Sequence, residues 1–394
     1  MSVSIQNDDD WRHWRDEWSI RPDTIYLNHG SFGPTPRTVR ECQLDWQQQL
    51  ISQPMDFFVR RYEPAWLAAR QRLAEFVGTS PENLAFVENS TAAMNTVANS
   101  ITLRPHDEVL LTDHEYGAVS RIWQRACQAA AAGPPRIARL PNKIETAEQV
   151  VDAIFNAATE RTRLLVVSHI TSPTAIILPI QQICDTARQR GIAVCVDGPH
   201  APAQIPLSLD ALLCDFYTAS LHKWVSAPFG SGFLFVAPSW QQHGRSPMLS
   251  WGRLLPEKPT TWWHEFIWQG TRDPTAYLAS TAAIDLLDRV GLPTFRARCH
   301  FLAKYARQRL VELTGLEPQT PDSDEWYGTM ISVPLPPGDA RRLQNALWQN
   351  HHIEVPVTDR NGQRSTRVSC HLYNTTAEID SLVTALDSLL RQEN

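Results

Sequence analysis

The sequence has no apolar run of about 18 residues, the shortest length expected of a membrane-spanning helix. Neither end carries the basic stretch followed by an apolar stretch that is typical of a targeting leader. Basic residues are not in excess either, because 36 lysines and arginines face 42 aspartates and glutamates, for a net charge of -6. A nucleic-acid or membrane partner is therefore not expected. We expect a soluble, cytoplasmic protein that binds a small molecule.

Paired cysteines are also missing. The seven cysteines form no CxxC pair and lie within apolar segments. Their spacing and odd number argue against a disulfide framework and indicate reduced core thiols. Internal repeats and low-complexity tracts are absent as well.

The chain has 394 residues, 43% of them hydrophobic, which is enough for two domains. Near the start, Trp11, Trp14 and Trp18 are spaced by three and four residues after an acidic run, which predicts an amphipathic helix. We expect residues 1–25 to form a helical segment that packs on the smaller domain or on a partner subunit. Burial of the tryptophans within the same chain and a contact between subunits are the two alternatives.

Residues 26–282 alternate short apolar runs with helical stretches, which indicates an α/β fold with a mainly parallel sheet and helices on both faces. The candidate strands are 108–113, 164–169, 193–198, 215–220 and 232–236. Residues 179–191 have the apolar spacing and the final glycine of a crossover helix. From residue 283 to 394, long helical patterns separate short strands, which predicts a smaller α+β domain.

Polar side chains gather at the carboxyl ends of four predicted strands, where open α/β sheets bind their ligands. In chain order, the groups are Asp113, His114, Glu115 and Tyr116; His169, Thr171 and Ser172; Asp197 and His200; and Ser220, His222 and Lys223. Each residue alone could be an ordinary turn, cap or structural residue. Four such groups on successive strands together predict a site at this edge.

Pyridoxal phosphate (PLP) is a cofactor that these residues fit. It requires a lysine for an aldimine, a carboxylate for the pyridine nitrogen, a ring that stacks on the cofactor and a phosphate site at a helix start. Lys223, Asp197 and Tyr116 offer the first three. The helical pattern that opens in ENSTAAMNTV offers the fourth through Ser90, Thr91 and Ala92. An ordinary Ser/Thr N-cap is the alternative for that stretch.

These motifs resemble those of the class V aminotransferase group of fold-type I PLP enzymes. The resemblance extends over nearly the whole chain, through YLNHGSFGPTP, NSTAAMN, DHEYGA, VDGPHAPAQIPLSL, FYTASLHKW, GSGFLFV and RVSCHLYNT. Within the group, the chain is most similar to the isopenicillin N epimerase-like branch, which is related to cysteine desulfurases and carbon-sulfur lyases. The resemblance implies a sheet of the seven-stranded type, a smaller α+β domain and PLP as cofactor.

The resemblance also implies roles for single residues. Lys223 would form the Schiff base, Asp197 would hold the pyridine nitrogen and Tyr116 would stack on the cofactor ring. The phenolic oxygen of the cofactor would be held by Ser172 and His200, and its phosphate by Ser90, Thr91, Ala92, Ser220 and His222.

Two further implications concern the partner and the substrate. Gly270 and Thr271 resemble a segment that reaches the phosphate from the neighbouring subunit, which implies a homodimer with shared active sites. Arg367 resembles the arginine that binds the α-carboxylate of the substrate, a task suited to a guanidinium group. Asn28 and His29 would line the substrate side.

The implied chemistry takes place at the α-carbon of an amino acid. The substrate displaces Lys223 to form an external aldimine, and the freed lysine removes the α-proton to leave a quinonoid carbanion. Reprotonation on the opposite face makes the protein an epimerase or racemase, with Tyr116 and His29 as candidate proton donors. Loss of a β-substituent makes it a carbon-sulfur lyase, and protonation at the cofactor makes it an aminotransferase. We expect isopenicillin N epimerase-like chemistry.

Cysteine and tryptophan positions refine this expectation. Residues 351–367 contain no cysteine, which argues against the persulfide mechanism of the cysteine desulfurases. Cys370 is expected to be a core thiol. Packing between subunits is favoured over an aromatic wall for a bulky substrate at Trp262, Trp263 and Trp268.

Two functions from other classes stay open. A metal-dependent hydrolase could use Asp113, His114, Asp197, His200 and His222, although no HExxH or similar short motif is present. A PLP-like fold could also serve as a catalytically silent binding module. The presence of both Lys223 and Asp197 argues against that alternative.

Overall fold

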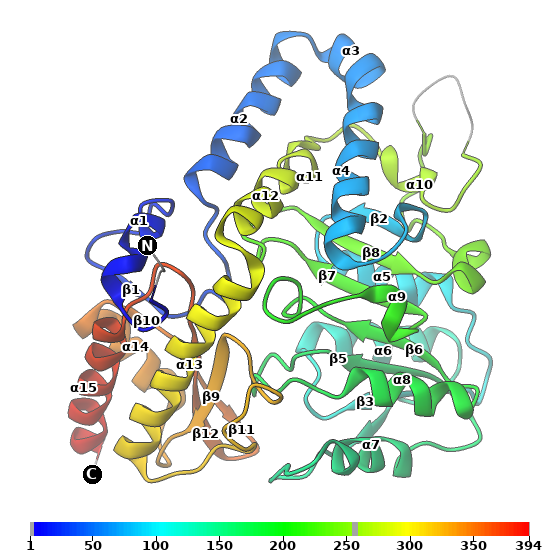
Figure 1. Ribbon diagram of the computed structural model, residues 1–394. Coiled ribbons are helices and arrows are strands. Elements are labelled where there is room, and N and C mark those ends of the chain that lie inside the picture. The colour runs from blue at the N-terminus through cyan, green and yellow to red at the C-terminus, as the bar shows by residue number, and fades with distance from the viewer. Residues whose placement is uncertain (1–3, 254–258, 394) are drawn as a thin grey trace.

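The computed structural model describes residues 4–253 and 259–393 and centres on a seven-stranded sheet (Figure 1). The strand order is β2-β8-β7-β6-β5-β3-β4, in which β8 is antiparallel to both of its neighbours and the other pairs are parallel. The strands are β2 (Leu84–Val87), β3 (Glu108–Thr112), β4 (Arg136–Ala138), β5 (Thr162–Ser168), β6 (Ala193–Asp197), β7 (Phe216–Ser220) and β8 (Gly232–Val236). The predicted fold class is confirmed.

Helices cover both faces of this sheet, which explains why its strands are almost continuously apolar. One set of neighbouring helices is α5 (Ser90–Ser100) and α6 (Gly117–Ala129); the other is α7 (Ala147–Asn156), α8 (Ile180–Gln189) and α9 (Leu209–Leu212). All five predicted strands and the predicted crossover helix, α8, are present. The prediction omitted β2 and β4 because they are very short, and two of the three β4 residues are exposed.

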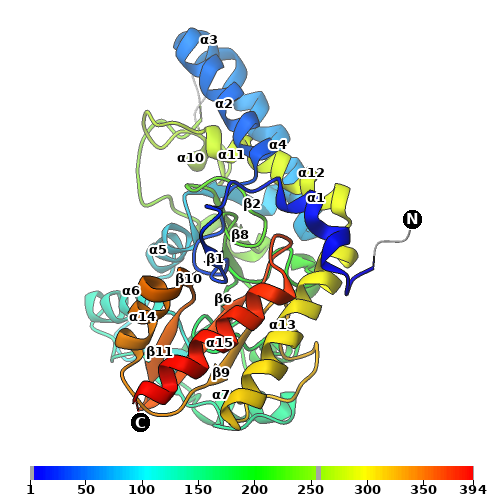
Figure 2. The same ribbon diagram turned by 90° about the vertical axis from the view of Figure 1, so that its left-hand side faces the viewer.

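A helical arm projects beyond the sheet, with α3 at its tip (Figures 1 and 2). It consists of α2 (Arg37–Ser52), α3 (Pro54–Asp56), the π-helical turn η2 (Phe57–Arg61) and α4 (Tyr62–Val77). The short helices η3 (Pro81–Asn83), η4 (Pro238–His243), α10 (His264–Ile267) and α11 (Thr275–Leu278) connect the larger elements. The arm leaves several apolar side chains exposed, among them Leu44, Ile51, Met55 and Val59.

The C-terminal part contains a second, antiparallel sheet in the order β11-β12-β9, formed by β11 (Val357–Arg360), β12 (Gln363–Ser369) and β9 (Met330–Pro334). The helices of this part are α12 (Ser280–Val290), α13 (Leu292–Thr314), α14 (Ala340–His351) and α15 (Thr376–Glu393). Helix α12 spans the predicted boundary at residue 283, and it packs against α2 and α4 of the larger part. We propose that the smaller domain begins at Gly291, where a left-handed turn (φ 83°) separates α12 from α13.

The predicted N-terminal helix is shorter than expected. A 3-10 turn, η1 (Asp8–Trp11), leads into α1 (Arg12–Arg15), so Trp18 lies beyond the helix. The acidic run is anchored from outside, because Asp8 pairs with Arg298 of α13 and accepts a hydrogen bond from the backbone of Thr376 at α15 (3.0 Å). Trp11 and Trp18 are buried within the chain itself, as the first of the two alternatives predicted.

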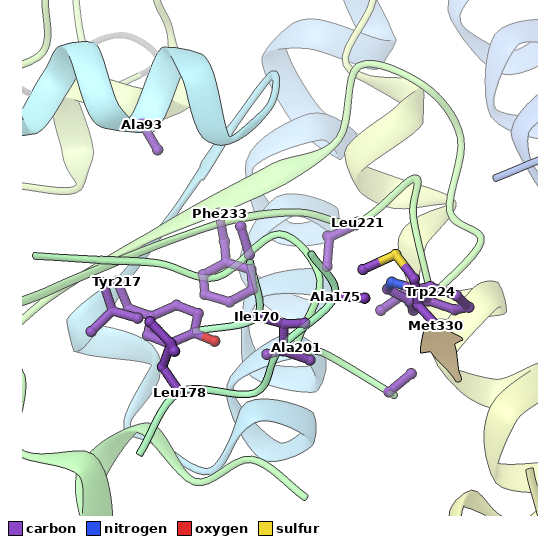
Figure 3. Packing of buried hydrophobic residues seen from close by; sticks show 14 of the residues in the cluster. Ala93, Ile170, Ala175, Leu178, Ala201, Tyr217, Leu221, Trp224, Phe233 and Met330 are labelled. Carbon is purple, nitrogen blue, oxygen red and sulfur yellow. The ribbon is translucent and has the colours of Figure 1, made fainter. Parts of the chain in front are cut away.

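The N-terminal segment also joins the two parts of the fold. The strand β1 (Ile25–Tyr26) pairs in parallel with β10 (Ile353–Glu354). The apolar core is continuous from the large sheet, where Tyr217 and Phe233 stack, to Trp224 and to Met330 of β9 in the small sheet (Figure 3). No helix in the described part of the chain is long and apolar enough to cross a membrane.

Gly232 is required where the chain before α5 crosses the start of β8. A Cβ atom at this position would lie 2.6 Å from the carbonyl oxygen of Ala219 and 2.9 Å from Cα of Asn89. Glycine therefore allows the loop at Asn89 to lie directly on the strand ends.

We predict that Gly232→Ala lowers the free energy of unfolding by about 2 kcal/mol, because backbone atoms must move to admit the methyl group. Thermal unfolding of both proteins measures the effect. Gly133→Ala is the control, since its added Cβ meets no atom within 4 Å. Equal losses of stability in the two variants would contradict the close approach at Gly232.

Candidate active site

Asp197 lies at the centre of the edge that the strand ends form. It ends β6, in register with Ser168 of β5 and Thr218 of β7. Thr218 Oγ1 donates a hydrogen bond to Asp197 Oδ1 (2.9 Å). The carboxyl group is buried, and this burial raises the pKa of Asp197 to about 6. The group is placed to bind a buried cation such as a protonated ring nitrogen.

Lys223 lies in the turn that follows β7. Its Nζ atom is 3.0 Å from Nε2 of His200, whose Nδ1 accepts a hydrogen bond from Trp224 Nε1 (3.2 Å). Burial, followed by the positive charge of Arg367, lowers the pKa of Lys223 to about 7, although Asp197 opposes the shift. A substantial fraction of this amine is therefore a neutral nucleophile near neutral pH.

Hydroxyl and amide groups gather at the start of α5. Ser220 Oγ accepts a hydrogen bond from the backbone N–H of Ser90 (2.9 Å), and the two hydroxyl groups lie 3.2 Å apart. Asn89 caps the helix by accepting a hydrogen bond from Ala92 N (2.9 Å), and Thr91 is exposed. Such a helix start favours an anion.

The segment with Gly270 and Thr271, which is predicted to reach the partner subunit, is followed by a residue that contacts its own chain. Arg272, which directly follows Gly270 and Thr271, pairs with Glu88 just before α5. Gly270 itself has a left-handed backbone (φ 99°). This ion pair places Arg272, at the end of the segment, near the start of α5 in the same chain.

Arg367 of β12 faces the large sheet from the smaller domain. Its guanidinium group donates to the carbonyl oxygen of Ser172 (2.7 Å), to Ser31 Oγ (2.7 Å) and to Asn28 Oδ1 (3.4 Å). Burial lowers the pKa of Arg367 to about 10, so the group stays charged. A cavity of about 280 Å³ next to it is lined by Ser31, Glu115, Tyr116, Ser172, Thr358 and Arg367.

Two buried polar atoms are placed to bind an anionic ligand. Among the residues that the structure describes, Nδ1 of His222 and Nε of Arg367 are buried and have no hydrogen-bond partner. His222 adjoins Lys223, and Arg367 lines the cavity. Together with Asp197, Lys223 and the α5 start, these atoms fit a cofactor with a phosphate and a substrate with a carboxylate.

His29 is placed differently from the other predicted substrate-side residues. Its side chain is fully buried, with Nδ1 2.9 Å from the hydroxyl group of Tyr373 and Nε2 3.0 Å from the backbone oxygen of Lys223. Burial lowers the pKa of His29 to about 3, so the ring is neutral. Both nitrogens therefore contact protein groups, and His29 supports the lysine turn from behind.

Asp113 and His114 link the two parts of the fold. His114 Nδ1 lies 2.9 Å from Asp113 Oδ1, while Asp113 Oδ2 accepts a hydrogen bond from Arg360 of β11 (2.8 Å). Within residues 4–253 and 259–393, no group of three or more His, Cys, Asp or Glu side chains could hold a metal ion. The metal-dependent hydrolase therefore lacks a ligand set in this part of the chain.

The tryptophans near residue 265 pack within their own chain. Trp262 Nε1 and Trp263 Nε1 donate to the backbone and side chain of Glu82 (2.9 and 2.7 Å), and Arg70 lies 3.6 Å from the ring centre of Trp263. Trp262 and Trp263 thus pack against Glu82 and Arg70 of the same chain, and the expected packing between subunits stays a prediction. Neither one forms a wall of the cavity at Arg367.

Sequence reasoning did not assign roles to three residues of this site. Ser31 binds Arg367, Trp224 binds His200, and Glu115 lines the cavity. Ser31 lies in the motif YLNHGSFGPTP, and Trp224 ends the motif FYTASLHKW, so the motifs contained both residues without indicating their contacts. Glu115 accepts a local hydrogen bond from Thr112 Oγ1 and another from Ser168 Oγ (2.6 Å each), and the second depends on the pairing of β3 with β5.

The fold and the groups at this edge are those of a PLP-dependent enzyme. The profile described as aminotransferase class-V matches residues 49–382. The chain therefore belongs to the class V aminotransferase family, whose cofactor is PLP, and the predicted family, enzyme class and cofactor are confirmed.

Individual relatives support the same assignment. The chain is 39% identical to isopenicillin N epimerase of Amycolatopsis lactamdurans and 37% identical to that of Streptomyces clavuligerus, over 96% of this chain and 98% of each relative. It is 27% identical to a cysteine desulfurase of Haloferax volcanii, over 92% of this chain and 89% of the relative.

A solved structure has the same fold at lower identity. It is a mutant of C-DES with glycine covalently linked to its PLP cofactor, and it aligns with a TM-score of 0.82 at 21% identity. The alignment covers 95% of this chain and 98% of that chain.

Glu115 provides a test of the electrostatics of the site. Burial raises the pKa of Glu115 to about 7, and the charge of Asp197 contributes to the increase. A carboxyl group with a raised pKa binds its proton more tightly in the folded state, so its ionisation costs stability as pH rises through this range.

We predict that Glu115→Gln gains stability relative to wild type by about 1–3 kcal/mol between pH 5 and pH 8, because the variant has no carboxyl group to ionise. Thermal unfolding of the cofactor-free proteins at both pH values measures the difference. Glu317→Gln, which changes an exposed residue, controls for the loss of one charge. If the stability of wild type relative to Glu115→Gln instead increases with pH, the predicted direction of the effect is wrong.

Proposed function

We propose that the protein is an isopenicillin N epimerase-like enzyme that inverts the configuration at the α-carbon of an amino acid. The observation that carries this proposal is the match of 39% and 37% identity with two isopenicillin N epimerases over almost the full length of all three chains. The cysteine-free segment 351–367 supports it, since a persulfide route needs a nucleophilic cysteine near Arg367. Cys370 is fully buried, and burial raises the pKa of its thiol.

Some residues of the site are assigned to the cofactor and others to the substrate. When bound, PLP stabilises negative charge at the α-carbon of an attached amino acid. Asp197 would hold the ring nitrogen, and Tyr116 would stack on the ring. The phosphate would be held by Ser90, Thr91, Ala92, Ser220 and His222, where the α5 start offers backbone N–H groups and Nδ1 of His222 has no hydrogen-bond partner.

Arg367 and Lys223 act on the substrate. Arg367 binds the α-carboxylate through its free Nε–H, and Asn28, Ser31 and Ser172 orient the guanidinium group. Lys223 takes the α-proton as a neutral amine. We assign His29 to support of the lysine turn rather than to substrate contact, because both of its ring nitrogens are already engaged.

Inversion needs a second group that returns a proton on the other face. Tyr116 is the N-cap residue just before α6, has a half-exposed side chain and lines the cavity beside Arg367, whereas Lys223 comes from the turn after β7. Its hydroxyl group is therefore the proton donor in this proposal.

We predict that the purified holoenzyme exchanges the α-proton of its substrate for deuterium and interconverts the two configurations, without releasing pyruvate, ammonia or sulfide. Isopenicillin N and a panel of L- and D-amino acids are the substrates, and NMR with chiral chromatography measures the products. Lys223→Ala should abolish the visible band and lower the rate at least about a thousandfold, because the attachment site and the base are lost.

The same assay separates the alternatives. Release of pyruvate, ammonia and sulfide from cysteine would instead identify a carbon-sulfur lyase, and formation of a keto acid with an aminated cofactor would identify an aminotransferase. A protein that cannot be loaded with PLP would contradict the assigned role of Lys223.

We further propose a homodimer in which Gly270 and Thr271 reach the phosphate of the partner subunit. Exposed apolar side chains support an interface: Leu44, Ile51, Met55 and Val59 on the arm, and Met248, Leu249 and Trp251 in the segment before residue 254. Large apolar side chains exposed to water in this number favour association.

We predict that light scattering gives twice the chain mass of 44.6 kDa. Ile51→Glu, at a side chain that is 73% exposed, should weaken the dimer at least about tenfold, because a charge would be buried. Ile137→Glu on β4, 48% exposed, is the control and should leave the mass unchanged. A monomeric wild-type holoenzyme would refute the shared site.

A further inference from the structure

Trp224 lies directly after the reactive lysine, and both side chains reach the same imidazole. The indole Nε1 of Trp224 donates to His200 Nδ1 (3.2 Å), and His200 Nε2 is 3.0 Å from Lys223 Nζ. Trp224 and His200 are each 1% exposed, so water does not compete for these hydrogen bonds. The imidazole therefore connects the indole to the amine.

The turn that presents these side chains is tightly constrained. Ser226 N donates to the carbonyl oxygen of Lys223 (2.8 Å), and Ala227 N donates to that of Leu221 (3.1 Å). Gly33 packs against the same turn, because a Cβ atom there would lie 2.4 Å from the carbonyl oxygen of His222. Lys223 and Trp224 are thus held in fixed positions relative to His200.

The chemistry of the indole group sets the protonation of the imidazole. An indole N–H can only donate, so the Nδ1 atom that accepts from it must carry a lone pair. Burial lowers the pKa of His200 well below its usual value, and the ring is neutral. Its single proton is then on Nε2, which faces Lys223.

We propose that Trp224 is a positioning residue that fixes the tautomer of His200 and thereby keeps the amine of Lys223 in its neutral form. An Nε2–H group can donate only to an amine with a free lone pair, and an ammonium group has none. The role of Trp224 in the reaction rests on the proposed function of Lys223, whereas the tautomer of His200 does not depend on that function.

Other groups also act on the lysine. The charge of Arg367 opposes protonation and that of Asp197 favours it, while His222 is adjacent and His29 binds the backbone oxygen of Lys223. All four remain when Trp224 is replaced. Because the contribution of Trp224 passes through one hydrogen bond, it can be separated from theirs.

The first test reads the tautomer in the wild-type, cofactor-free protein. Nitrogen NMR of ring-labelled histidine distinguishes a protonated from an unprotonated ring nitrogen, and His200→Gln identifies the signals of His200 among 13 histidines. We expect an unprotonated Nδ1 and a protonated Nε2 at neutral pH. The opposite tautomer, or a mixture of the two, would overturn the proposal, and this test needs no substitution of Trp224.

The second test measures the amine itself. Carbamoylation by cyanate requires the neutral amine, and mass spectrometry of the Lys223 peptide gives its rate at each pH. In Trp224→Phe, His200 can place its proton on Nδ1 and accept a hydrogen bond from the ammonium form of Lys223. The pH midpoint of the carbamoylation rate should therefore rise by about one unit. Phenylalanine retains an aromatic ring beside His29 and His371.

Trp240→Phe is the matched control, because it removes an indole that donates to Asp215 (2.7 Å), which precedes β7 at the end of that strand opposite to Lys223. Its Lys223 midpoint should equal that of wild type. An unchanged midpoint in folded Trp224→Phe would refute the proposal, as would an equal shift in both variants. Neither test uses a substrate. Failure of the proposed epimerase function can therefore be distinguished from failure of this proposal.

Discussion

The structure depends on placing one uncharged amine in a buried position among charged and polar groups. Burial and the guanidinium group of Arg367 both disfavour the ammonium form of Lys223, and in our proposal a hydrogen bond donated by His200 Nε2 adds to them. Asp197 acts in the opposite direction, yet its own ionisation is weakened by burial. The outcome is a lysine poised near neutral pH, and the surrounding contacts serve to hold it there.

Several separate parts of the chain meet at this lysine. The N-terminal segment brings His29 against the backbone of the lysine turn, and β12 brings Arg367 from the smaller domain. The hydrogen bond from Arg360 to Asp113 ties the neighbouring strand β11 to the end of β3. The site is therefore assembled by the closure of the smaller domain and the N-terminal segment on the large sheet.

Sequence patterns predicted the regular parts of the fold well because burial on both faces produces uninterrupted apolar strands. They failed where local pattern was weak: β4 has three residues, two of them exposed, and β2 has four. They overextended the first helix, because the spacing of Trp11, Trp14 and Trp18 was helical while Trp18 Nε1 instead donates to the backbone of Pro34. Tertiary contacts outweighed a short helix with few hydrogen bonds of its own.

The residue types along the chain, together with the resemblance to the class V aminotransferase group, indicated the cofactor, since a lysine and an aspartate at neighbouring strand ends and a polar helix start meet its requirements. They could not show that His29 faces the protein interior, that Ser172 contacts Arg367, or that Trp224 and Lys223 share His200. These contacts join residues that are distant in sequence, and no local periodicity reports the direction of a side chain across two packed elements. Periodicity and spacing specify which residues reach the sheet edge, whereas burial and hydrogen bonding between distant segments decide their protonation and therefore their chemistry.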